Sequence, residues 1–299
     1  MLDIGCWGPN FPFPLSAIYR INRGVAWPNN CRYKTSLMLW DDIQRIRAEA
    51  PLVHNITNYV VMNSTANALL ALGASPVMAH ACQEVEEMVS LARALVINMG
   101  TLSTAWVEAM VKAGQEAQRR GIPVVFDPVG CGATKYRTTT AQKLTEELHP
   151  TIIRGNASEI RALLRSGQGT KGVDSTHTPE EVIEEAKALS SACRCVVSVS
   201  GAVDLIVAGN AVMRVANGHP IMSRVTGMGC IATAITGAFA AVNPLPLQAA
   251  AHAMAAVGIA GELAAERSTG PGSFEPQFLD ALYLLQESDI TQRLKMQGG

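Results

Sequence analysis

The sequence predicts an α/β protein built on a mostly parallel central sheet with helices on both faces. Short apolar runs alternate with helical segments from residue 52 onward, as parallel strands joined by helices require. The apolar runs carry few charges, as strands do when both faces of their sheet are covered. With 299 residues, 48% of them hydrophobic, the chain can form one large α/β domain or two small ones. No linker interrupts it after residue 38, which favours one domain.

The first elements are predicted from apolar runs and from the residues that end them. Leu52–Ile56 suits a strand. Asn58 is a residue type that caps helices, and the helix that it would begin is expected to run until Gly73. A short extended piece at 77–78 and an amphipathic helix over 84–94, with an acidic first turn, are expected to follow.

The middle of the chain repeats the alternation. Ser103 is expected to cap a helix that ends at Gly121, and Thr138–Leu148 is expected to form the next helix. The apolar runs between these helices are predicted to be buried strands, at 95–98, 124–126 and 151–153.

The last third is predicted to add a helix, a strand, a hairpin and three more helices. After a loop at 167–175, Thr178, Pro179 and Glu181 form a capping box with a proline at the first helical position. Turn residues between two apolar runs indicate the hairpin. The expected elements are a helix to about residue 191, a strand at 195–199, a hairpin of 203–207 with 211–215, and helices over 229–241, 247–267 and 276–287.

Composition argues against several functional classes. A formal net charge of −1 gives no basic surface for nucleic acid or an anionic membrane. The most apolar segment, 249–265, contains His252 and Glu262, so we expect a buried helix rather than a membrane span. The seven cysteines are odd in number and form no CxxC pair, which favours a reducing cytoplasm over a disulfide framework or a zinc site.

Residues 1–37 differ from the rest of the chain. They are rich in aromatic residues and proline and show neither helical nor strand periodicity. They also lack the pattern of a signal peptide. Because Met38 opens a regular pattern, we expect 1–37 to be an atypical, disordered N-terminal extension and 38–299 to be a single domain.

Polar and glycine residues follow the predicted strands at the points where each strand ends. In open α/β sheets, ligands bind at the carboxyl ends of the strands, so these residues are expected to gather around one site. The segments are Asn98–Gly100, Asp127–Gly130, Arg154–Glu159, Ser200–Gly201 and Thr226–Cys230.

The last of these segments, Thr226–Cys230, is a glycine-rich turn that leads into an uncharged helix of Ala, Ile and Thr. Glycines allow close approach of a ligand, and the first amides of a helix bind phosphate. Cys230 falls in the first turn, where a thiolate would be stabilised. The alternative is a turn that only leads the chain into a packed helix.

The other candidate residues each have a structural alternative. Asp127 could hold Mg²⁺ directly or through water, or could form an Asp-Pro turn. Glu159 at the same edge suits a metal bound to phosphates, but with Asn156 it also matches a capping box. Arg154 could neutralise phosphoryl charge. Met78 could contact a small ligand or belong to the core.

From about Met38 onward the chain resembles the hydroxyethylthiazole kinases of the ribokinase-like superfamily. Several motifs in order make this resemblance specific, whereas any one of them alone would not. The matching stretches are Pro51–Asn58, Leu69–Met78, Asn98–Leu102, Asp127–Gly130, Ile153–Ile160, Lys171–Asp174, Val225–Cys230 and Gly270–Phe274.

The resemblance implies ATP-dependent phosphorylation of the primary alcohol of 4-methyl-5-(2-hydroxyethyl)thiazole, a salvage step toward thiamine. It implies a ribokinase-like fold and Mg²⁺. It also implies a homotrimer with thiazole sites near the subunit boundaries. By position, Met78 and Gly227 correspond to substrate contacts, with Asn58 nearby.

The same resemblance implies roles for the remaining candidates. Arg154 and Ser200 correspond to ATP contacts, and family members can carry threonine in place of Ser200. Asp127 and Glu159 match the metal-associated acids. Cys230 takes the place of the aspartate base of most ribokinase-like kinases, and the extension 1–37 has no counterpart.

Three alternative functions compete with this one, and the residues disfavour two of them. Another small-molecule kinase of the same fold, such as a hydroxymethylpyrimidine kinase, is disfavoured by Cys230 and the segment around Met78. A non-catalytic ligand-binding oligomer of the same fold would differ by having no phosphoryl transfer. A dinucleotide oxidoreductase is disfavoured because no GxGxxG motif follows an early strand.

Overall fold

The computed structural model describes residues 29–165 and 179–298. The first 28 residues of the expected extension, the loop at 167–175 with the Lys171–Asp174 motif, and Thr178 lie outside the described residues. The strands in the described part are β1 (Leu52–Ile56), β2 (Ser75–Val77), β3 (Ala94–Asn98), β4 (Val124–Asp127), β5 (Ile152–Asn156), β6 (Val196–Ser200), β7 (Asp204–Ala208), β8 (Ala211–Val215) and β9 (Met296–Gly298).

The helices connect these strands or follow them. They are α2 (Asn29–Glu49), α3 (Met62–Leu72), α4 (Val85–Leu91), α5 (Thr104–Arg120), α6 (Lys135–Leu148), α7 (Ala157–Arg165), α8 (Pro179–Cys193), α9 (Met228–Val242), α10 (Pro246–Arg267), α11 (Pro271–Leu284) and α12 (Glu287–Arg293), with the short 3-10 helix η1 (Pro220–Arg224) before α9.

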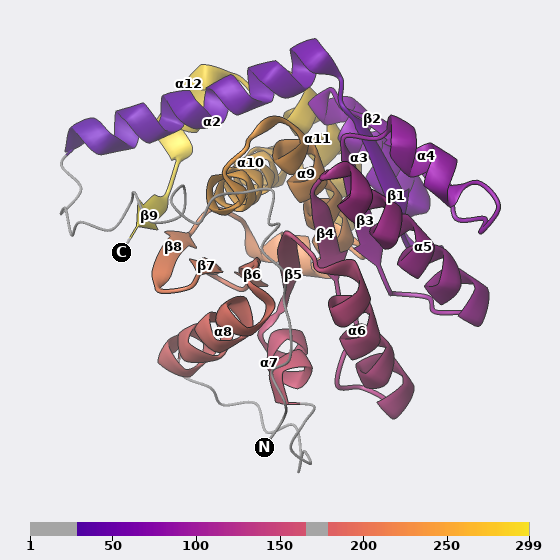
Figure 1. Cartoon of the computed structure of the whole chain (residues 1–299). Coiled ribbons are helices and arrows are strands. Elements are labelled where there is room, and N and C mark those ends of the chain that lie inside the picture. Colours follow the sequence, from indigo (N-terminus) through magenta and orange to yellow (C-terminus); the bar gives the residue numbers. More distant parts are fainter. Residues whose placement is uncertain (1–28, 166–178, 299) are drawn as a thin grey trace.

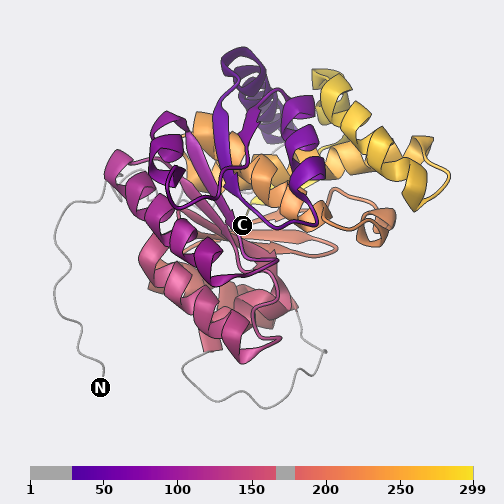
Figure 2. The same cartoon turned by 90° about the vertical axis from the view of Figure 1, so that its right-hand side faces the viewer.

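The described strands form one sheet in the order β2-β1-β3-β4-β5-β6-β7-β8-β9. Neighbouring strands are parallel from β2 to β6 and antiparallel from β6 to β9. In Figure 1 the sheet runs from β2 and β1 on the right to β8 and β9 on the left. Figure 2 shows the helices on both faces. The predicted α/β class with a mostly parallel, covered sheet is confirmed.

The central strands send alternate side chains to two separate cores. On β3, Val96 packs in the core that contains α9 and α10, whereas Leu95 and Ile97 pack in the core that contains α5. All three are at most 1% exposed. Successive side chains of a strand point to opposite faces, so a strand covered on both sides must be apolar throughout.

The topology creates one natural binding crevice. The chain passes from β1 through α3 to β2 on one side, and then returns to place β3 on the other side of β1. In open α/β sheets, ligands bind outside the carboxyl ends of the strands at the point where the strand order reverses. That point lies between Ile56 of β1 and Asn98 of β3.

Most of the residues that were predicted to begin or end a helix do so, and one prediction is wrong. Gly73 ends α3 with a left-handed φ of 109°, and the Ser103 hydroxyl accepts from the Trp106 amide at the start of α5. Asn58 does not cap α3, whose N-cap is Val61. Residues 58–61 form a turn instead, closed by the Val61 amide bonding to the Asn58 carbonyl at 3.2 Å.

The terminal segments differ most from expectation. Helix α2 begins at Asn29, so the expected domain boundary at residue 38 falls inside a helix, and Ser36 is only 1% exposed. Helix α11 begins at Pro271 rather than at 276, since Pro271 occupies the first turn and Pro276 is accommodated within the helix. The sequence patterns did not predict α12 or β9.

The long apolar helix is part of the core. Within the described residues, α10 is long and apolar enough to cross a membrane, but 83% of its most apolar window is buried inside the protein. His252 on this helix is 2% exposed. The expected buried helix over 249–265 is therefore confirmed.

Candidate active site

Side chains from four strand ends and one helix start converge at the carboxyl edge of the sheet. Asn98 and Asp127 are register partners at the ends of β3 and β4. Asn58 follows β1, and Arg154 lies near the end of β5. Across the edge stands the start of α9, with Cys230 in its first turn. The predicted gathering of strand-end residues is thus present in the fold.

The Asp127 carboxylate is held by two neutral donors. Its Oδ2 accepts from the Asn98 amide at 2.9 Å and from the Thr233 hydroxyl of α9 at 2.7 Å. The residue is 3% exposed. Burial raises the pKa of Asp127 to about 6, because the positive charge of Arg154 and the two donors do not offset desolvation and the nearby negative charge of Glu159.

Asn58 connects this carboxylate network to the thiol. Its Nδ2 donates to Asn98 Oδ1 at 2.9 Å and lies 3.5 Å from Cys230 Sγ. Its Oδ1 accepts from the Val60 amide at 3.1 Å. Asn58 also packs closely against Gly100, where a Cβ atom would stand 2.5 Å from Asn58 Nδ2. The side chain is therefore fixed on all sides.

Cys230 differs electrostatically from expectation. Burial and the negative charge of Asp127 raise the pKa of the Cys230 thiol, although the amides of Asn98 and Asn58 and the charge of Arg154 act in the opposite direction. The expected stabilisation of a thiolate at this helix start is therefore wrong for the resting protein. The main reason is burial of the thiol in the folded protein, and the second is the Asp127 carboxylate that β4 brings close. The local sequence around Cys230 reveals neither.

The start of α9 has the geometry of an anion site. Gly227 has a left-handed φ of 83°, and a Cβ atom there would lie 2.6 Å from Val61 Cγ1, so the turn requires glycine. The first intrahelical bond joins the Ile231 amide to the Gly227 carbonyl at 2.8 Å. The amides of residues 228–230 precede it and have no intrahelical partner, so they face outward from the positive end of the helix.

Arg154 completes the positive side of this site. It is 6% exposed, and its buried Nε has no hydrogen-bond partner among the described residues. A Cβ atom on Gly229 would lie 3.3 Å from Arg154 Nη1, so the guanidinium lies directly beside the first turn of α9. A buried guanidinium beside free helix amides favours an anionic ligand.

Glu159 forms the capping box with Asn156, which was the alternative to a role in metal binding. Its Oε2 accepts from the Asn156 amide at 2.8 Å, while Asn156 Oδ1 accepts from the Glu159 amide at 2.9 Å. Its Oε1 accepts from the Gly130 amide at 2.8 Å. Glu159 thereby joins the loop after β4 to the start of α7, with one lone pair on each oxygen left for other ligands.

The two remaining candidates lie at the sides of this cluster. Ser200 ends β6, beside β5, and its hydroxyl donates to the Gly155 carbonyl at 3.3 Å. Met78 follows the edge strand β2 and is half-buried. The next residue but one, His80, packs on the Trp106 ring, with the two ring centroids 4.5 Å apart.

Sequence reasoning missed two residues that organise the site. The Arg137 guanidinium donates to the Met99, Gly100 and Val129 carbonyls at 3.0, 2.7 and 2.8 Å, which ties the loops after β3 and β4 together. Nothing in the local sequence indicates this. Thr233 lies one turn after Gly229 and is one of two hydroxyl residues in an otherwise apolar helix, which was the one available signal.

The carboxylate oxygens at this edge of the sheet are suitable ligands for a magnesium ion. Both hydrogen bonds of Asp127 within the described residues fall on Oδ2, which leaves Oδ1 for a cation or its water. The described residues contain no group of three or more His, Cys, Asp or Glu side chains that could hold a metal ion by itself. Magnesium commonly binds through one or two carboxylates with substrate phosphates and water, which this carboxylate pair allows.

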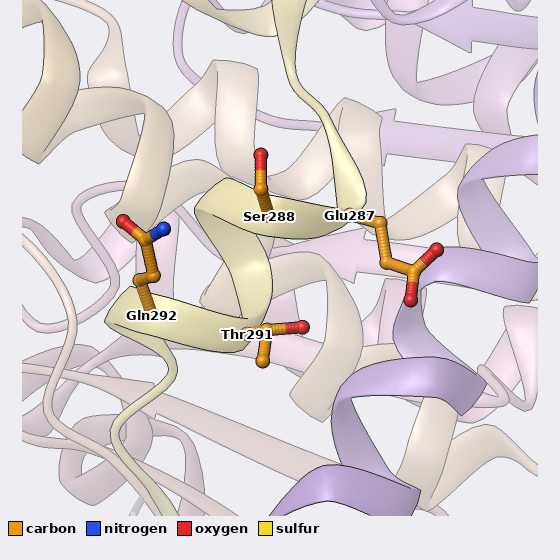
Figure 3. A pocket seen from close by; sticks show the side chains of 4 residues that line it. All are labelled: Glu287, Ser288, Thr291 and Gln292. Carbon is orange, nitrogen blue, oxygen red and sulfur yellow. The ribbon is translucent and has the colours of Figure 1, made fainter.

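A separate surface hollow on α12 carries no comparable arrangement. Figure 3 shows that its four lining side chains point in different directions along one short helix. They therefore do not converge on a ligand. The lining residues are Glu287, Ser288, Thr291 and Gln292.

Comparison with solved structures defines the class of the fold. A pyridoxal kinase from Staphylococcus aureus, solved in complex with pyridoxal, superposes with a TM-score of 0.60 over 83% of this chain and 97% of its own, at 16% identity. That likeness concerns the fold alone. Phosphoryl transfer depends on placed positive charge and amide donors, and both meet at the start of α9. Fold and site together are those of an α/β small-molecule kinase.

The family follows from the sequence comparisons. The model of the hydroxyethylthiazole kinase family matches residues 43–288, and the chain belongs to that family. A hydroxyethylthiazole kinase from Syntrophus aciditrophicus is 57% identical over 261 residues, which are 87% of this chain and 97% of that protein. The solved hydroxyethylthiazole kinase from Pyrococcus horikoshii is 44% identical, with a TM-score of 0.82 over 88% of this chain and 99% of its own.

Proposed function

We propose that this protein transfers the terminal phosphoryl group of ATP to the hydroxyl of 4-methyl-5-(2-hydroxyethyl)thiazole, a step of thiamine biosynthesis and salvage. Membership of a kinase family implies ATP as the co-substrate. The observation that carries the proposal is the juxtaposition of the α9 start, the Arg154 guanidinium and Cys230 at one edge of the sheet. The relatives named hydroxyethylthiazole kinase support the choice of the thiazole alcohol as the substrate.

ATP would bind between the end of β6 and the start of α9. Arg154 offers a guanidinium that lacks a partner at Nε, and Ser200 offers a hydroxyl at the neighbouring strand end. The amides of 228–230 would donate to the charge that develops on the transferring group. Removal of one such donor costs about 10²–10³ in kcat in other enzymes.

The thiazole alcohol would lie between Met78, Asn58 and Gly227. Its hydroxyl must approach Cys230, which receives the proton late in a loose transition state that depends little on base strength. Because the pKa of Cys230 is raised in the resting protein, the neutral thiol predominates before substrates bind. The side-chain amides of Asn98 and Asn58 and the positive charge of Arg154 favour the thiolate, so the acceptance of the proton depends on them.

Magnesium would be held by Asp127, with Glu159 acting through water. When bound, the ion would neutralise the negative charge of the phosphates. Glu159 uses both carboxylate oxygens on backbone amides, so its part is to hold the loop after β4 and to orient water. Asp127 is the acid with an oxygen to spare.

The protein is further proposed to be a cytoplasmic homotrimer with substrate sites near the subunit boundaries. Tyr59 and Val60, next to Asn58, are 63% and 65% exposed in the single chain. Large apolar side chains beside a site suggest that a second copy covers them. Light scattering coupled to gel filtration should give three times the mass of one chain, and a monomer would contradict this proposal.

A coupled assay of ADP release with the thiazole alcohol tests the activity. Hydroxymethylpyrimidine and pyridoxal serve as competing alcohols, and the protein without any alcohol serves as the control for ATP hydrolysis. We expect the thiazole alcohol to give the highest kcat/KM. A preference for hydroxymethylpyrimidine would identify the rival kinase, and binding of ATP without transfer to any alcohol would identify a non-catalytic binding protein.

A further inference from the structure

Asn98 occupies the middle of the site, and its amide is one of the two that favour the Cys230 thiolate. It ends β3 between Asp127 of β4 and Asn58 after β1, at the point where the strand order reverses. It is 1% exposed. Each of its amide atoms has a partner, so its position and orientation are determined by what surrounds it.

The orientation of the Asn98 amide follows from the chemistry of its partners. The Gly100 backbone N–H can only donate, and it lies 3.0 Å from Oδ1. The other end must therefore be the NH₂ group, which donates to Asp127 Oδ2 at 2.9 Å. Asn98 Oδ1 is then left facing the Asn58 NH₂ group, from which it accepts at 2.9 Å.

The orientation of Asn58 follows in turn. Its Oδ1 is occupied by the Val60 amide, so its NH₂ group must face both Asn98 and Cys230. An NH₂ group has two protons. One is used on Asn98 Oδ1, and the second is directed at the sulfur, 3.5 Å from Nδ2.

We propose that Asn98 is a positioning residue of the phosphoryl-transfer site, which holds the Asp127 carboxylate with its NH₂ group and, with its carbonyl oxygen, aims an N–H of Asn58 at the sulfur of Cys230. Its importance for turnover rests on the proposed function, whereas the aiming of Asn58 does not. The acid at the end of β4 and the thiol at the start of α9 are thereby linked through two amides rather than by direct contact.

The test measures the thiol itself, in the full-length protein without substrates. Cys230 is half-buried, and its modification by iodoacetamide is followed by mass spectrometry at pH 8. Asn98→Leu keeps the size of the side chain but removes its hydrogen bonds. Because thiolate is the reactive form, loss of the aimed N–H should slow alkylation of Cys230 about tenfold. Alkylation of the half-buried Cys82 in the same sample should not change.

A matched control is available on the adjacent strand. Asn55 is 1% exposed on β1, and its NH₂ group bonds only to the Val53 carbonyl among the described residues, at 2.9 Å. Asn55→Leu should leave the alkylation rate of Cys230 unchanged. If it slows alkylation as much as Asn98→Leu does, the effect is a general disturbance of the strand ends and the proposal is overturned.

A double-mutant cycle tests the route through Asn58. If Asn98 acts mainly by aiming Asn58, then Asn98→Leu should slow Cys230 alkylation much less in an Asn58→Leu protein than in the natural sequence. Additive effects would overturn the proposal. Gly100→Ala reaches the same amide without changing Asn98, since the new Cβ atom would stand 2.5 Å from Asn58 Nδ2. It should also slow alkylation, and it replaces Asn98→Leu if that variant does not fold.

Turnover provides a second readout that can fail separately. Asn98→Leu should lower kcat about tenfold or more while KM for ATP changes less than threefold, because the aimed N–H acts on the reacting thiol rather than on nucleotide binding. Unchanged alkylation in a folded variant overturns the proposal whatever the kinase activity. Slowed alkylation in a protein that never phosphorylates the thiazole alcohol would support the positioning and refute the proposed function.

Discussion

Two buried aspartates near opposite ends of α9 have opposite electrostatic surroundings. Asp127 contacts Thr233 near the start of the helix, and Asp42 of α2 contacts Asn243, which follows its last residue. Both are at most 3% exposed. The pKa of Asp127 is raised to about 6 by burial, whereas the pKa of Asp42 lies below its ordinary value.

The difference lies in the partners. Burial acts on Asp42 too, but it is outweighed by hydrogen bonds from His252 and Asn243, each at 2.6 Å, and from Arg45. Asp127 receives two neutral donors and lies near a second acid, Glu159. A carboxylate whose negative charge is balanced by hydrogen bonds and positive charge within the protein stabilises the fold. A carboxylate with too little positive charge around it is suited to bind a cation.

The largest expected effect is on catalysis at Asp127. Asp127→Asn keeps an oxygen for the two donors but removes the charge, so we expect kcat/KM for Mg²⁺-ATP to fall about 10³-fold. The melting temperature should stay the same or rise, because the variant removes a desolvated charge. Steady-state kinetics and thermal melts check this, and a large loss of stability would make Asp127 resemble Asp42 and remove the contrast.

Asp42→Asn should have the opposite pattern, with a loss of stability and no loss of catalytic activity. It removes the buried carboxylate that His252, Asn243 and Arg45 contact, and the loss of hydrogen bonding to a charged group typically costs about 1.5–3 kcal/mol of the free energy of unfolding. The kcat of the folded fraction should remain that of the natural sequence, because Asp42 touches no site residue. Urea unfolding followed by circular dichroism, with kcat measured at low temperature, checks both parts. A kcat that falls with intact stability would contradict the structural role.

The two acids should also differ in their pH dependence. A lowered carboxyl pKa contributes stability above the unfolded pKa of about 3.9, and that stability is lost as the pH falls through the folded value. A raised pKa has the opposite sign, so the Asp127 charge costs stability as the pH rises from about 4 to 6. Asp127→Asn should therefore flatten the stability curve between pH 4 and 6 relative to the natural sequence, and Asp42→Asn should flatten it below that window.

Substitutions of Cys230 test whether the start of α9 is the catalytic end of the helix. Cys230→Ala should lower kcat about 10²-fold with little effect on KM, the low end of general-base effects, because the transition state is loose. Cys230→Asp should keep substantial activity, and Cys230→Ser should resemble alanine, since a hydroxyl is not ionised at neutral pH. Kinetics of the three variants, with melts as the folding control, decide. A fully active Cys230→Ala protein would leave the amides of α9 as the main catalytic element.

Glu159 tests how far the cation site extends. Glu159→Gln keeps one acceptor oxygen but removes the charge, so we expect about a tenfold increase in the Mg²⁺ concentration for half-maximal activity and a loss of about 1 kcal/mol from the capping box. Magnesium titrations and melts measure the two effects. If only stability changes, the capping box and the bond to the Gly130 amide are the whole role of Glu159.

The smallest effect is expected at the N-terminal side. Removal of residues 1–28 should leave activity and melting temperature nearly unchanged, because the family match begins at residue 43. Removal of 1–37 also deletes the first turns of α2 and the buried Ser36, so it should lower the melting temperature by a few degrees. Equal melting temperatures for the two truncated proteins would support the boundary at Met38.

The sequence by itself determined the class of fold and the set of strand-end residues. Apolar runs such as 95–98 and end signals such as Gly73 are local, and strands that alternate with helices make a parallel sheet the natural solution. The carboxyl edge of such a sheet was then the expected place for Asp127, Arg154 and the turn before Cys230. The motifs also identified the family, although they did not establish what each residue does.

Tertiary structure alone decided which atoms meet. Asn58 looked like a helix cap, but the turn at 58–61 leaves its side chain free to bridge Asn98 and Cys230. The Cys230 thiol has a raised pKa because the fold buries it and because β4 brings Asp127 near it, although a helix start by itself would favour the thiolate. Arg137 joins two loops through carbonyls that any sequence would supply. Hydrogen-bond partners and desolvation depend on distances across the fold, and local patterns of residues do not encode those distances.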